Sequence, residues 1–250
     1  MRNLRLLIAF EGTAYLGWQR QALGPTVQQV LEEAVEQITG TRSSVIGAGR
    51  TDAGVHAEGM VASFRTASPL APERLQEALN AVLPPDVAVL DLSDAPPDFH
   101  AQFSAKAKRY EYRVWPRRVR PVFDRERLWH VKWPLDVGLM NEGAAMVVGR
   151  RDFSAFCAAR STVLHGVRTV TQAEWFRRSG ALVFGIEGDG FLYNMVRIIV
   201  GSLVDVGRGK MSLEAFREAL ESGDRTRSGP TAPAKGLCLV RVDYSSDLWV

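Results

Sequence analysis

The fold of this chain is organised around one glycine-rich stretch, which reads Gly47-Ala48-Gly49-Arg50-Thr51-Asp52-Ala53-Gly54-Val55-His56-Ala57. Val45 and Ile46 precede it, and an alternating apolar run at residues 60–64 follows it. This pattern predicts a strand, a tight loop and a second strand. The glycines permit positive φ angles and close approach of the backbone to a ligand. The loop therefore presents a guanidinium, a carboxylate and an imidazole within a few residues.

The segments on either side of this hairpin predict an α+β unit. We expect an apolar strand at residues 2–10, a helix at 26–38 that begins with the Thr26/Gln29 capping pair, a helix at 72–83 and a strand at 87–92. With the hairpin, the order becomes β-α-β-β-α-β, which is the split ferredoxin-like pattern.

The same order of elements is expected after the Pro96-Pro97 boundary. We expect strands at 105–115, 167–177, 181–187 and 237–244, and helices at 136–148, 191–206 and 212–221. The halves share no sequence identity, so the repeat is inferred from element order alone. We therefore predict two ferredoxin-like halves, residues 1–95 and 96–250, with mostly antiparallel sheets side by side and an active cleft on the sheet face.

Composition is that of an ordinary globular protein, with 46% hydrophobic and 24% charged residues. Cys157 and Cys238 lack metal-ligand spacing, and the four histidines are scattered, so we expect neither a metal nor a disulfide. No stretch resembles a signal peptide or reaches the length of a membrane span. We expect a cytoplasmic protein that does not associate with membranes.

A basic segment with interleaved aromatic residues follows the boundary. Between residues 104 and 120 there is one acid, Glu111, against seven basic residues, which are Lys106, Lys108, Arg109, Arg113, Arg117, Arg118 and Arg120. Tyr110, Tyr112 and Trp115 lie among them. Cations for phosphates and aromatic rings for bases are typical of an RNA groove. The alternative is an edge strand that uses its charges to prevent pairing with other chains.

Arg197 is the only charged residue between Asp189 and Asp205, in a helix that is otherwise almost entirely apolar. A buried charge without a partner costs about 3–5 kcal/mol. We therefore expect Arg197 to find a carboxylate, for which Asp52 is the natural candidate. The alternative is an arginine that extends from the helix edge into solvent.

The string Gly49–His56 is identical to the G-R-T-D-A-G-V-H motif of the TruA family of tRNA pseudouridine synthases, which this chain resembles. Further matching stretches lie at residues 10–21, 103–113, 191–197 and 231–237, so the resemblance spans essentially the whole chain. It implies a tRNA pseudouridine synthase that acts at positions 38, 39 and 40 of the anticodon stem-loop. It also implies a homodimer and a reaction without cofactor or metal.

The resemblance also implies roles for individual residues. Asp52 would be the nucleophile, Arg197 its ion-pair partner, and Tyr110 the residue that stacks on the target base. Arg50 would fill the space left by the extruded nucleotide, and Leu237 would pack beside the target ring. Binding of tRNA would further involve Lys106, Lys108 and Arg109.

Plainer structural roles remain open for the same residues. Asp52 could cap a polar turn, Tyr110 and Leu237 could be core residues, and Arg50 could be an ordinary loop arginine bound to a phosphate. We expect His56 to fix the loop by hydrogen bonding, and residues 11–21 to belong to the RNA-facing surface. Whether Asp52 attacks C1′, attacks C6 or removes a sugar proton stays open, because each route needs a carboxylate.

Two other functions compete with the synthase. One is a catalytically inactive RNA-binding or RNA-chaperone protein. The evidence against it is that the set of expected site residues is intact, namely Arg50, Asp52, Tyr110 and Arg197. The other is a metal-dependent nuclease that uses Asp52, Glu187 and Asp189, whose activity EDTA would abolish.

Overall fold

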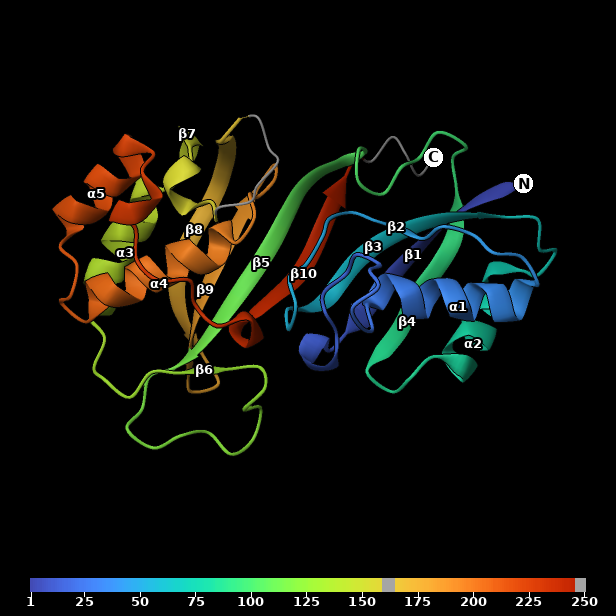
Figure 1. The fold of residues 1–250 in the computed structure, drawn as a ribbon, viewed down its shortest axis with the longest axis horizontal. Coiled ribbons are helices and arrows are strands. Elements are labelled where there is room, and N and C mark those ends of the chain that lie inside the picture. Colours follow the sequence, from blue (N-terminus) through green and yellow to red (C-terminus); the bar gives the residue numbers. More distant parts are fainter. Residues whose placement is uncertain (159–164, 246–250) are drawn as a thin grey trace. The chain divides into compact units, whose positions relative to one another are not determined.

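The computed structural model describes residues 1–158 and 165–245, which form two compact units (Figure 1). Unit 1 comprises Met1–Lys106 with Cys238–Val250, and unit 2 comprises Ala107–Leu237. The last strand therefore belongs with the first part of the chain, whereas the sequence led us to group residues 96–250 together.

Unit 1 contains a mostly antiparallel sheet with strand order β4-β1-β3-β10 and β2 paired to β3. The strands are β1 (Arg2–Phe10), β2 (Ile46–Gly47), β3 (His56–Thr66), β4 (Val87–Ala95) and β10 (Leu237–Tyr244). β10 runs parallel to β3 at Cys238 and His56. The helices are α1 (Val27–Thr39) and α2 (Pro72–Val82), so the β-α-β-β-α-β order predicted for this part of the chain is confirmed.

Local sequence explains the bounds of α1. The Thr26 hydroxyl oxygen accepts a hydrogen bond from the backbone N–H of Gln29 at 3.3 Å, which satisfies one free donor of the first turn. Gly40, with a φ of 69°, ends the helix in the left-handed conformation. The Gln29 side chain donates to Glu33, so only one half of the predicted capping pair forms.

The core of unit 1 lies along one face of its sheet. Leu4, Leu6 and Ile8 alternate along β1 and are fully buried. The ladder pairs them with Phe64, Ala62 and Met60 of β3, in that order. Because directly paired residues share a face, these side chains form one continuous apolar surface.

In unit 2 the antiparallel strands follow the order β5-β9-β8-β7, and β6 pairs in parallel with β5. Its strands are β5 (Ala105–Trp115), β6 (Trp129–His130), β7 (Gly149–Asp152), β8 (Val167–Arg178) and β9 (Ala181–Gly188). Its α-helices are α3 (Val137–Met146), α4 (Met195–Gly207) and α5 (Leu213–Ser222). The α+β class predicted from the sequence is confirmed.

Short elements complete the chain, and the sequence does not predict them. β6 and β7 span two and four residues, too few for a periodic pattern. The 3-10 helices are η1 (Gly12–Ala14), η2 (Ser154–Phe156), η3 (Arg225–Arg227) and η4 (Ala234–Gly236).

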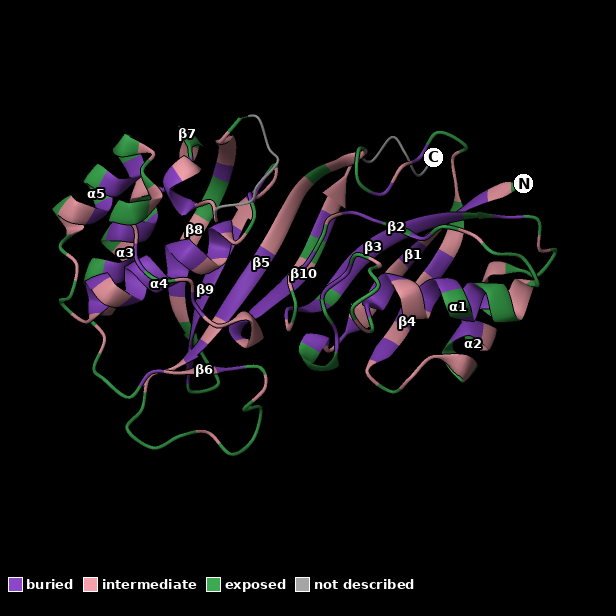
Figure 2. Cartoon of the chain, in the orientation of Figure 1, coloured by how far each residue is buried: buried purple, intermediate pink, exposed green. Residues whose placement is uncertain are grey.

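α4 begins four residues later than expected. Asn194 has a φ of 62°, a left-handed conformation that ends regular helix geometry on its N-terminal side. Every residue of α4 except Arg197 and Asp205 is buried, and the helix is mostly purple in Figure 2. No helix in the described part of the chain is both long enough and apolar enough to cross a membrane.

Candidate active site

Asp52 lies half-buried in the loop between β2 and β3. Its backbone carbonyl accepts a hydrogen bond from Val55 N at 3.1 Å, which closes a turn that Gly54 completes with a φ of 78°. The preceding Thr51 is buried. The loop is therefore a defined turn that carries Asp52.

A second loop holds this turn in place through its backbone. Trp18 N donates to the carbonyl of Thr51 at 3.1 Å, and Gly54 N donates to the carbonyl of Tyr15 at 3.3 Å. Gly12 N donates to Nδ1 of His56 at 3.0 Å, as expected for a histidine that fixes the loop. That acceptor role places the proton of a neutral imidazole on Nε2.

The two loops approach so closely that only glycine fits at the contact. A Cβ atom on Gly17 would lie 2.4 Å from the carbonyl oxygen of Thr51, and one on Gly12 would lie 2.0 Å from that of Val55. Gly17 also has a φ of 89°. Both glycines thus allow the second loop to pack directly against the Asp52 turn.

The aromatic residues of this second loop are part of the core. Tyr15 and Trp18 are 6% and 2% exposed, and the Trp18 ring covers Gly47. The Tyr15 hydroxyl donates to Asp86 Oδ1 at 2.6 Å, and burial together with this carboxylate raises the pKa of Tyr15. We expected residues 11–21 to face RNA, but these two side chains face inward, and the backbones of the same two residues bond to the turn.

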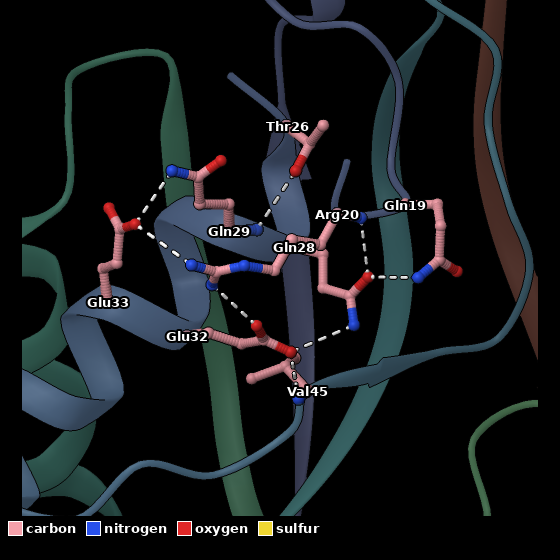
Figure 3. Close-up of polar contacts among 8 residues, drawn as sticks. All are labelled: Gln19, Arg20, Thr26, Gln28, Gln29, Glu32, Glu33 and Val45. Atoms are coloured by element: carbon pink, nitrogen blue, oxygen red, sulfur yellow. Dashed lines mark hydrogen bonds and ion pairs between the residues drawn. The ribbon is translucent and has the colours of Figure 1, made fainter. Parts of the chain in front are cut away.

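A buried polar network anchors both loops to α1 (Figure 3). The Glu32 carboxylate accepts from Arg20 Nη1 at 3.0 Å, from Gln28 Nε2 at 3.0 Å and from Val45 N at 3.2 Å. Gln28 Oε1 in turn accepts from Gln19 Nε2 and from Arg20 N, both at 2.9 Å. One helix thus holds the chain just before the turn and the end of the bracing loop.

Sequence reasoning missed Glu32 and Gln28, which look like ordinary polar positions of an amphipathic helix. The only sign in the sequence that residues 11–21 support the Asp52 turn is the presence of Gly12 and Gly17 in an unusually aromatic loop. Arg50, by contrast, is exposed at the start of the turn, where the sequence places it.

In unit 2, Arg197 is oriented by its neighbours. Nε donates to the carbonyl of Ala232 at 2.8 Å, and Nη1 donates to Oδ1 of Asn194 at 2.8 Å. The left-handed conformation of Asn194 places this amide one turn before Arg197. Two bonds fix the plane of the guanidinium, which is half-buried on the otherwise buried helix α4.

Tyr110 and Tyr112 share one face of β5, as alternation predicts. Tyr110 is 8% exposed and meets the edge of Phe191, with ring centroids 5.3 Å apart and planes at 88°. The Tyr112 hydroxyl donates to the carbonyl of Pro233 at 2.7 Å, and burial raises its pKa. Leu237 is buried where η4 leads into β10.

The basic residues of β5 divide between its two faces. Lys108 shares the face of Tyr110, and Lys106 is exposed. Arg109 points to the opposite face, where Nη1 donates to Gln172 Oε1 at 2.9 Å and lies 3.8 Å from Glu187 Oε2.

Within residues 1–158 and 165–245, no three His, Cys, Asp or Glu side chains lie close enough together to hold a metal ion. In unit 2, Glu187 lies beside Arg109, and Asp189 Oδ1 accepts from Thr169 N at 3.0 Å.

The family model for tRNA pseudouridine synthase matches residues 6–104 and 144–245. The chain therefore belongs to the tRNA pseudouridine synthase family, and the membership predicted from the sequence is confirmed. Curated relatives named tRNA pseudouridine synthase A are similar over nearly their whole length. The protein of Moorella thermoacetica is 47% identical over 246 residues, which cover 98% of this chain and 100% of the relative. The protein of Syntrophotalea carbinolica is 46% identical, and the match covers 98% of this chain and 97% of the relative. The protein of Acetivibrio thermocellus is 44% identical, and the match covers 98% of this chain and 100% of the relative.

Proposed function

We propose that this chain is a tRNA pseudouridine synthase that converts uridine to pseudouridine at positions 38, 39 and 40 of the anticodon stem-loop. Family membership and the names of its full-length relatives support the reaction class. The observation that carries the proposal is the Asp52 turn, a carboxylate-bearing loop braced on both sides by backbone hydrogen bonds. A catalytic side chain has to be held in a fixed position by its surroundings, and this bracing supplies that support.

The reaction is an isomerisation that balances without an oxidant or a second substrate. The C1′–N1 bond of uridine breaks, a C1′–C5 bond forms, C5 loses its proton and N1 gains one. We assign Asp52 as the nucleophile, because an ionised carboxylate can attack C1′ or C6, and can equally remove a sugar proton. None of these routes requires a cofactor.

We assign Arg197 as the ion-pair partner of Asp52. Support comes from its fixed guanidinium plane and from its position on a helix that is otherwise buried and almost uncharged. At about 4 Å and an effective dielectric constant of about 20, such a pair attracts by roughly 4 kcal/mol before desolvation. This attraction favours the ionised carboxylate in a site closed by a nucleobase.

The remaining residues are assigned to recognition of the everted nucleotide. Tyr110 stacks on the target base, a contact worth about 1–3 kcal/mol, and Leu237 packs beside the ring. Arg50 occupies the vacated position in the RNA, which suits an exposed planar cation.

Lys106, Lys108 and Arg109 bind the RNA backbone in this proposal. Arg109 would exchange its bonds to Gln172 and Glu187 for a phosphate to do so. We further propose a cytoplasmic homodimer in which one tRNA contacts both subunits.

The direct test incubates the purified protein with tRNA transcripts that carry uridine at positions 38, 39 or 40, without any cofactor. We expect pseudouridine at those positions and nowhere else in the transcript. Tight tRNA binding without conversion would instead identify an inactive RNA-binding protein. Conversion at other positions alone would retain the reaction and refute the assigned sites.

A further inference from the structure

Three cations gather on one face of the unit 2 sheet, close to where β5 begins. Lys108 of β5 pairs with Gly188 of β9, which pairs with Val170 of β8. Arg168 lies two residues before Val170 and therefore on the same face. On the next strand, Arg151 of β7 is directly opposite Arg168. β5, β9, β8 and β7 lie in this order in Figure 1.

The described residues offset these charges only in part. Directly opposed like charges in a sheet are destabilising. Arg151 Nε donates to the carbonyl of Val148, and Arg168 Nη1 donates to those of His165 and Val167. These bonds leave several N–H groups of each guanidinium for another acceptor. In residues 1–158 and 165–245, no carboxylate forms an ion pair with Lys108, Arg151 or Arg168.

The nearby acids are used elsewhere. Asp152 Oδ1 accepts from the backbone N–H and the hydroxyl of Ser154, and Asp189 Oδ1 accepts from Thr169 N. Burial and the Arg168 guanidinium lower the pKa of Lys108, and the field of Asp189 opposes this shift only in part. The cluster therefore has an excess of positive charge, carried by the half-buried Lys108 and Arg168 and by the exposed Arg151.

We propose that Lys108, Arg151 and Arg168 form a phosphate-binding site for the backbone of the tRNA substrate. The inference rests on the proposed function and adds Arg151 and Arg168 to its binding surface. An RNA phosphodiester fits best, because Lys108 stands two residues before Tyr110 on the same face. Adjacent positions then offer a cation for a phosphate and an aromatic ring for a base. A phosphate between the arginines would also relieve their repulsion.

The test is the salt dependence of tRNA binding. Each phosphate contact adds about 0.7–0.9 to the slope of log K against log salt concentration. The double variant Arg151→Gln/Arg168→Gln should lower this slope by about 1–2 and weaken binding several-fold at low salt. Arg151→Lys/Arg168→Lys should restore most of the slope. Arg217→Gln, which removes an exposed arginine paired with Glu214 on α5, should bind like the parent protein.

Thermal unfolding separates binding from folding. The Gln double variant should melt close to the parental temperature, because the lost bonds from Arg151 and Arg168 to backbone carbonyls are offset by the removal of a repulsion. A much lower melting temperature would give these arginines a structural role and overturn the proposal. An unchanged salt slope in a parent that converts tRNA would overturn it and leave the proposed function intact. A parent that forms no pseudouridine would refute the proposed function separately. Inorganic phosphate can be compared with chloride as a competitor of tRNA at equal ionic strength. If phosphate competes more strongly, but the Gln double variant keeps the parental salt slope, the RNA assignment is refuted.

Discussion

Gly17 shows how one residue sets the position of the candidate nucleophile. We expect Gly17→Ala to destabilise the protein by about 2–5 kcal/mol, because the new methyl group meets the Thr51 carbonyl at 2.4 Å and the φ of 89° is unfavourable. Turnover at saturating tRNA should fall as well, since the displaced carbonyl is adjacent to Asp52. Denaturant unfolding and single-turnover conversion measure the two effects.

Gly40 supplies the matched control for this variant. It also has a positive φ, of 69°, but a Cβ there would meet nothing within 4 Å. Gly40→Ala should therefore cost only the backbone term, about 1–2 kcal/mol, and leave turnover unchanged. Equal losses in the two variants would show that contact with the Thr51 carbonyl is unimportant.

Thr51 offers a second test at the scale of a single residue. Its buried hydroxyl has no hydrogen-bond partner among the described residues. Thr51→Val replaces it with a methyl group of similar size, so the free energy of unfolding should stay the same or rise by up to about 1 kcal/mol. A loss of stability in urea unfolding would reveal a bond that the folded protein needs.

At the scale of elements, α1 connects folding to the site. Glu32→Ala removes the shared acceptor of Arg20, Gln28 and Val45. We expect a loss of about 2–4 kcal/mol, because the Val45 N–H and the Gln28 amide lose their partner away from water. The neighbouring variant Glu33→Ala should cost no more than about 1 kcal/mol, because its pair with Arg20 is longer, at 3.6 Å, and exposed. Similar melting temperatures for the two variants would contradict the anchoring role of Glu32.

The same elements show what the sequence can predict and why it stops there. α1, β1 and β5 follow from periodicity and local caps, so their bounds agree closely with expectation. α4 starts late because the left-handed Asn194 interrupts a mostly apolar run, and the hydrophobic pattern alone does not mark the break. The bonds from Trp18 and Tyr15 to the Asp52 turn join backbone atoms, which any sequence provides. They could not be predicted from residue identity.

At the scale of the whole molecule, the Gly49–His56 motif is enough to predict the family and to select the candidate residues. The division into units was less accessible, because β10 joins β3 through a parallel pairing of residues far apart in the chain. The Arg151 and Arg168 pair was equally hidden, because it depends on the register between a four-residue strand and β8.

Metal removal tests the reaction class on the intact protein. Pseudouridine formation should proceed at the same rate after dialysis against EDTA, because an isomerisation driven by a carboxylate needs no Lewis acid. The nuclease alternative predicts RNA cleavage that EDTA stops. Cleavage products in gel analysis that disappear with EDTA would favour that alternative.

The most direct measurement follows tritium release from tRNA labelled at C5 of uridine, comparing the parent protein with Asp52→Asn and with the exposed α1 variant Glu36→Gln. We predict that Asp52→Asn binds tRNA and melts like the parent but releases tritium about 1,000-fold more slowly or not at all, while Glu36→Gln matches the parent. Release by Asp52→Asn at a rate near that of the parent would contradict the assignment of this carboxylate as the catalytic group.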